Sequence, residues 1–123
     1  MNENKKPTDQ EIEAAKEKLK KAKQELQKAE QAWEDDGFVD ALKEKSQEEK
    51  DKALKDKLEV GKKILEIENA QMNLITDRVA ENSKELESAT KELGDSLETL
   101  TNVTRILDAV GALLSIVTRI LAL

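Results

Sequence analysis

The chain has 123 residues, of which 39% are charged and 2% aromatic, and its formal net charge is −6. It contains no His, Cys or Tyr, so the usual general base, thiolate nucleophile and phenolic acid are missing. We therefore expect a protein that is not an enzyme and that holds no cofactor and no metal ion. The acidic balance also argues against nucleic acid as a partner, since a phosphate backbone requires a basic surface.

Residues 1–7 are mostly polar, contain the only Pro of the chain, and are predicted to form a disordered N-terminus. Thr8, followed three residues later by Glu11, matches a capping box and predicts that a helix begins there. Apolar residues then recur three and four positions apart, and every second one is Ala. Such a narrow stripe is typical of a coiled-coil strand: Ile12, Ala15, Leu19, Ala22, Leu26, Ala29 and Trp33.

Asp35, Asp36 and Gly37 predict the first break in the helix. Gly readily adopts the left-handed conformation that ends a helix, and Asp36 is a good cap for the next one. Trp33 and Phe38 flank this turn and are expected to stack across it. Residues 8–57 are therefore predicted to form a charged helical hairpin arm with its turn near residues 35–37, projecting as a spacer or docking arm.

Residues 58–123 are predicted to form one long heptad coiled-coil helix, because ten consecutive heptad positions are apolar. Gly94 to Ser96 is the one place where this helix is expected to bend or break. A second row of core positions includes two polar residues, Glu68 and Asn82, which we expect to set the register of the coiled coil. The apolar row is Leu58, Leu65, Met72, Val79, Leu86, Leu93, Leu100, Leu107, Leu114 and Leu121.

After Val103 the apolar stripe widens to more than half of the helix surface, and the remaining positions are polar. A face this wide is too broad for a two-stranded coil to cover, so neighbouring chains, a partner protein or a membrane must cover it. The predicted fold class is therefore all-α, an elongated helical hairpin with a long coiled-coil second helix in an oligomeric bundle of more than two strands. The expected oligomer or partner interface is Leu86, Leu93, Leu100, Val103, Leu107, Val110, Leu113, Leu114, Val117 and Leu121.

The sequence thus predicts a non-enzymatic self-assembly or protein-interaction module that oligomerises through its C-terminal helix. The alternative is a membrane-active protein that docks or inserts residues 103–123 in a lipid surface. In broad plan such a chain is similar to the α-helical pore-forming toxins, a similarity of architecture that rests on no sequence motif. A larger protein partner for the same segment is a third interpretation. The N-terminal residues have no apolar signal region, so a cytoplasmic location is expected, with leaderless export as the alternative.

Overall fold

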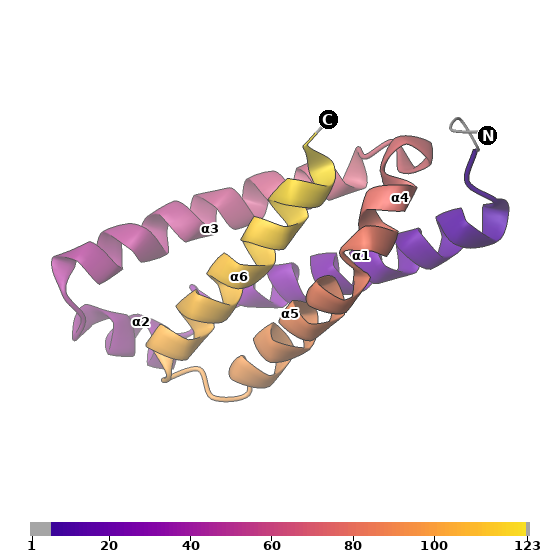
Figure 1. Cartoon of the computed structure of the whole chain (residues 1–123). Helices are drawn as coiled ribbons and strands as arrows, with labels where there is room; N and C mark the ends of the chain where they lie inside the picture. The colour runs from indigo at the N-terminus through magenta and orange to yellow at the C-terminus, as the bar shows by residue number, and fades with distance from the viewer. Residues whose placement is uncertain (1–5, 123) are drawn as a thin grey trace.

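A computed structural model describes residues 6–122, and these residues form a bundle of six helices (Figure 1). The prediction of an all-α fold is confirmed. Residues 1–5, on which most of the predicted N-terminal disorder falls, lie outside the described residues. The helices are α1 (Asp9–Ala32), α2 (Asp36–Lys43), α3 (Gln47–Glu68), α4 (Met72–Glu81), α5 (Ser83–Ser96) and α6 (Val103–Leu121).

The capping box predicted at the start of α1 is confirmed. The Thr8 hydroxyl accepts a hydrogen bond from the backbone N–H of Glu11 at 3.1 Å, and the Thr8 N–H donates to Glu11 Oε1 at 2.9 Å. From there α1 runs along α3, α4 and α5 and contacts all three. It is therefore part of the bundle, which corrects the expectation that residues 8–57 project as an arm. Its buried side chains are Ala and Leu only: Ala15, Leu19, Ala22, Leu26, Ala29 and Ala32.

The turn between α1 and α2 lies where the sequence places it, but its chemistry differs in two respects. The cap of α2 is Asp35, not Asp36, and its carboxylate accepts a hydrogen bond from Phe38 N at 3.1 Å. Gly37 lies inside α2, and no described glycine has a positive φ, so no left-handed residue closes α1. The expected contact between Trp33 and Phe38 is confirmed, with ring centroids 5.3 Å apart and planes inclined by 58°.

The prediction of one continuous helix over residues 58–123 is wrong, because the chain breaks at three places. Two of the breaks are centred on asparagines. Asn69 Nδ2 donates to the carbonyl of Leu65 at 3.0 Å, and Asn82 Nδ2 donates to that of Arg78 at 2.8 Å. Asparagine side chains compete in this way with the backbone for helix carbonyls, which favours helix ends. The heptad phase continues through both breaks and so gives no sign of them.

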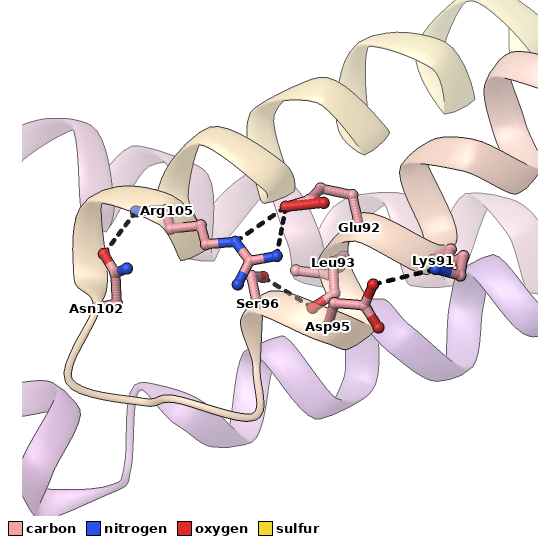
Figure 2. Close-up of polar contacts among 7 residues, drawn as sticks. All are labelled: Lys91, Glu92, Leu93, Asp95, Ser96, Asn102 and Arg105. Carbon is pink, nitrogen blue, oxygen red and sulfur yellow. Dashed lines mark hydrogen bonds and ion pairs between the residues drawn. The ribbon is translucent and has the colours of Figure 1, made fainter.

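The third break is a loop over residues 97–102 that lets α6 fold back along α5 (Figure 2). The helix passes through Gly94 and ends at Ser96, whose hydroxyl donates to the Leu93 carbonyl at 2.8 Å. Asn102 caps α6 by accepting from the N–H of Arg105 at 3.3 Å. The Arg105 guanidinium then reaches back to Glu92 Oε1, with Nη2 at 2.9 Å and Nε at 3.0 Å, and so ties the two helices together.

Helix α6 is the centre of the bundle and contacts each of the other five helices. In Figure 1 it lies between α3 and α5. The wide apolar face predicted for this segment is confirmed, but the chain itself covers it. This corrects the premise that neighbouring chains or lipid must do so. The buried residues of α6 are Val103, Ile106, Leu107, Ala109, Val110, Leu113, Leu114, Ile116, Val117 and Ile120.

Candidate protein-interaction surface

The structure gathers the ten residues of the expected oligomer interface in the core of a single chain. Eight of them are buried, and Leu100 and Leu121 are partly buried and pack against the same core. The polar side of α6 faces outward as the sequence indicates, with Arg105, Asp108 and Arg119 exposed. The C-terminal helix therefore presents its polar side, and not its leucines, to the surroundings.

The two residues expected to set the register of a coiled coil lie at the surface or its edge. Glu68 is exposed, and its carboxylate is 4.0 Å from Lys23 Nζ of α1. Asn82 is half-buried between α4 and α5, and its Oδ1 accepts from Arg119 Nη1 at 3.0 Å. Neither side chain lies within an apolar seam, so within this chain Glu68 forms a surface ion pair and Asn82 ends α4.

Helix α3 carries apolar residues on two different faces. The inner face is small or β-branched and packs against α1 and α6; it comprises Ala53, Val60, Ile64 and Ile67. The outer face carries Leu54, Leu58 and Leu65, whose exposed fractions are 59%, 69% and 61%. We call these three leucines the α3 stripe. Figure 1 shows α3 along the upper left edge of the bundle, with the end of α6 crossing in front of its C-terminal part.

The α3 stripe has the geometry of a short coiled-coil seam. At 3.6 residues per turn its leucines fall within a sector of about 40°, and they extend over about 16 Å of helix. Gly61 occupies the remaining seam position between Leu58 and Leu65, beside Glu30 of α1. The seam ends at Asp51 on one side and at Glu68 on the other, so its apolar part is confined to the stripe.

Four lysines border the α3 stripe, and the spacing between them is regular. Lys55 and Lys62, seven residues apart, follow one edge, and Lys50 and Lys57, also seven apart, follow the other. We call these the edge lysines. In the part of the chain that the structure describes, none of them lies within 4 Å of a carboxylate. Their ammonium groups are therefore not neutralised by direct ion pairs.

The carboxylates on the inner flank of α3 are engaged within the helix itself. Lys63 is buried, and its Nζ lies 3.0 Å from Glu66 Oε1 and 3.8 Å from Glu59 Oε1. Burial raises the pKa of Asp56, and the charges of Lys52 and Lys55 offset part of this effect. In α3, two carboxylates thus pair with the buried Lys63 and a third, Asp56, is partly buried, whereas the edge lysines have no direct ion pair.

The hollows of the surface lie away from the α3 stripe and have mixed charge. A hollow of about 420 Å³ between α1 and α5 is bordered by both lysines and carboxylates. Lys18 and Lys91, two of its lysines, are paired with Glu87 and Asp95 respectively. Among residues 6–122 no three potential metal ligands cluster, and no helix there is long and apolar enough to span a bilayer. The α3 stripe is thus the feature of the surface that best fits a binding role.

Comparison with known protein families, with curated proteins and with solved structures found no match to this chain.

Two leucines of the α3 stripe, Leu58 and Leu65, belong to the heptad row found in the sequence, which predicted that they are buried. The edge lysines were missed, although the lysines at 50, 55, 57 and 62 are visible in the sequence as a border of the seam. A second signal was also available. The row Ala53, Val60, Ile64 and Ile67 shows that this segment has another apolar face, which can pack while the leucines stay outside.

Proposed function

We propose that the protein is a non-enzymatic interaction module that binds an amphipathic helix of another protein along the outer face of α3. The observation that carries this proposal is the exposure of Leu54, Leu58 and Leu65 in one line. Fully burying a leucine side chain contributes about 1.5–3 kcal/mol relative to leaving it exposed. Burying three aligned leucines therefore contributes substantially to the free energy of binding a partner helix.

The width of the α3 stripe favours a helix as the occupant. A sector of about 40° corresponds to the narrow seam of a coiled coil, whereas a helix that lies in a membrane interface has a broad apolar face. No aromatic residue lies in α3 to anchor such a face.

The edge lysines make a second copy of α3 an unfavourable occupant. In a parallel pair, Lys50 would face Lys55 of the other copy, and Lys57 would face Lys62. In an antiparallel pair, Lys55 would face Lys62. Both arrangements bring unpaired lysines together, and like charges at these positions disfavour association. A different chain is therefore the better partner.

Self-assembly through α6, the interaction that the sequence favours, would require this helix to leave the core. Its ten buried residues, such as Leu113 and Val110, would lose their contacts with the rest of the bundle. The outer face of α3 needs no such rearrangement. We therefore place the interaction on α3 while keeping the general class of function, a non-enzymatic helical interaction module.

The test uses two fluorescently labelled leucine-seam peptides of four heptads, one with Glu and one with Lys at both edges, at nanomolar concentration. Like charges at the edges keep both peptides from pairing with themselves. At least one peptide should bind the full chain in fluorescence anisotropy at about 0.5 M salt, where surface charge is screened. Leu58→Ala combined with Leu65→Ala should weaken that binding at least tenfold, or about 1.4 kcal/mol.

Leu74→Ala is the matched control, because Leu74 is 51% exposed on α4, outside the α3 stripe. It should leave peptide binding unchanged. Absence of binding by both peptides, or equal loss in the control, would contradict the proposal. Vesicles of anionic lipid provide the membrane comparison. Binding to vesicles that Leu58→Ala with Leu65→Ala abolishes, without binding to either peptide, would assign the stripe to a lipid surface instead.

A further inference from the structure

We infer that the helix bound by α3 is acidic along both edges of its own apolar seam. This inference rests on the proposed function and adds the chemistry of the partner. It follows from the edge lysines, which stand at the positions that flank a partner helix in a coiled coil. Those positions determine partner choice and orientation, because their charges meet across the interface.

The edge lysines all carry the same charge, whereas the rest of the chain mixes basic and acidic side chains. All four flanking positions from 50 to 62 are Lys, while the whole chain has a net charge of −6. Three of them, Lys55, Lys57 and Lys62, are exposed, and Lys50 is half-buried. A local surface of the sign opposite to that of the whole molecule favours a negatively charged partner at this one face.

The basic region is bounded along the helix, which limits where the partner can be acidic. Asp51 and Glu68 occupy the two ends of the seam. Acidic residues in the partner are therefore expected opposite Lys55, Lys57 and Lys62, over about two heptads. Opposite the two ends of the seam, neutral or basic residues fit better.

The two edges of the α3 stripe are not equivalent. The edge that carries Lys50 and Lys57 faces α1, where Glu30 lies beside Gly61, with its Oε2 3.4 Å from the position that a Cβ would take. This carboxylate offsets part of the positive charge on that edge. Lys55 and Lys62, on the opposite edge, should therefore contribute more to binding an acidic helix.

The experiment compares the Glu-edged and the Lys-edged peptide at low salt, with the same leucine seam in both. The Glu-edged peptide should bind at least tenfold more tightly, because several exposed charge pairs, each of modest strength, act together. Raising the salt to about 0.5 M should remove most of this difference, since the Debye length falls below the spacing of exposed charges.

Reversing one edge of the protein gives the complementary readout. Lys55→Glu combined with Lys62→Glu should weaken the binding of the Glu-edged peptide at least tenfold. The same double variant should bind the Lys-edged peptide more tightly. Lys21→Glu combined with Lys84→Glu changes the net charge equally, at exposed sites on α1 and α5, and Lys21 borders the hollow between these two helices, away from the α3 stripe. At about 0.1 M salt, where the Debye length is about 10 Å, this control should shift both affinities by less than about twofold, because exposed charges farther apart than that are screened.

The outcomes separate this inference from the proposed function. Equal binding of both peptides at low salt, with loss on truncation of the leucines, would overturn the acidic partner and leave the interaction module intact. Tighter binding of the Lys-edged peptide would likewise overturn the acidic partner and leave the interaction module intact. Absence of binding by both peptides at either salt concentration would overturn both. Equal effects of the two double charge reversals would show that net charge acts, and not the edge lysines.

Discussion

Helices α3 and α6 carry leucines at the same heptad spacing, but those of α6 are buried and those of α3 are exposed. Leu107 and Leu114 of α6 are buried, whereas Leu58 and Leu65 of α3 are among the most exposed large apolar side chains of the described chain. The difference lies in the positions that flank the leucines. In α6 one flank of the leucines is apolar (Ile106, Leu113 and Ile120) and widens the buried face, while in α3 the flanking positions from 50 to 62 are the edge lysines.

This comparison shows that a heptad row of leucines is not enough to locate a core. Helix α3 buries its other face, where Val60 is fully buried and the small side chain of Ala53 is fully enclosed. Burying the leucines instead would place the edge lysines against the bundle, and uncompensated charge is costly to bury. The fold therefore keeps the leucines of α3 in solvent and uses the broader apolar face of α6 at its centre.

The largest expected effect is a loss of stability when a buried leucine of α6 is truncated. Leu113→Ala in α6 removes a fully buried side chain from the centre of the bundle. It should lower the free energy of unfolding by about 2–5 kcal/mol, the sum of lost burial and of the cavity left behind. Urea denaturation followed by far-UV circular dichroism measures this loss.

The matched variant is Leu54→Ala on the α3 stripe, which makes the same truncation at a side chain that is 59% exposed. Its effect should lie within about 0.5 kcal/mol of zero. Similar losses in the two variants would mean that the α3 stripe is buried in solution, in contrast to its exposure here.

A smaller effect concerns the starts of the same two helices. Asn102 caps α6, and the fully buried Val103 follows it directly, so fraying of this end disturbs the core. Asn102→Ala should lower the free energy of unfolding by about 1 kcal/mol, as expected for loss of a cap. Asn102→Asp, which keeps an acceptor for the Arg105 N–H, should restore most of the stability.

Ser46 caps α3 in the same manner, by accepting from Glu49 N at 3.2 Å. The first buried residue of α3 is Ala53, almost two turns later. Ser46→Ala should therefore increase hydrogen exchange in the first turn of α3 and cost less global stability than Asn102→Ala. A loss in Ser46→Ala as large as that in Asn102→Ala would show that the two helix starts are equally fixed.

Much of the local structure could be predicted from the sequence, because the signals are local. The capping box at Thr8, the turn after Trp33 and the amphipathic division of α6 each depend on residues within one or two turns of helix. The breaks at Asn69 and Asn82 could not be predicted from hydrophobic spacing, since the apolar phase continues across them. Once the chain bends there and turns back at residues 97–102, α6 can fold against α1 and α3 of the same chain.

The sequence placed the interaction surface on α6 because it predicted one continuous helix. A continuous helix would have needed other chains to cover Leu107 and Leu114. In the folded chain these residues are buried, and the exposed leucines that form a row are those of α3. The packing of α1 and α6 against the inner face of α3 decides which of its two apolar faces remains outside.

The smallest predicted effect concerns the flank of α3 that turns toward the bundle. The Asp56 side chain is 13% exposed, its Oδ2 has no hydrogen-bond partner, and Lys52 Nζ lies 4.0 Å away, too far to donate one. Burial raises the pKa of Asp56 above 3.8, so folding disfavours the charged carboxylate. Asp56→Asn should therefore raise the free energy of unfolding at pH 7, by less than the loss of the Asn102 cap, because Lys52 and Lys55 offset part of the desolvation.

The pH dependence fixes the sign of this effect. Between pH 3.8 and the higher pKa of the folded state, the folded chain binds more protons than the unfolded chain, so stability falls as the pH rises through this window. The advantage of Asp56→Asn should accordingly shrink as the pH falls through the window and vanish below about pH 3.8. Asp51→Asn, the same charge change at an exposed site of α3, measures the effect of charge removal alone. A loss of stability in Asp56→Asn at pH 7 would mean that attraction to the two lysines outweighs desolvation, and that the inner flank of α3 is held by charge as well as by packing.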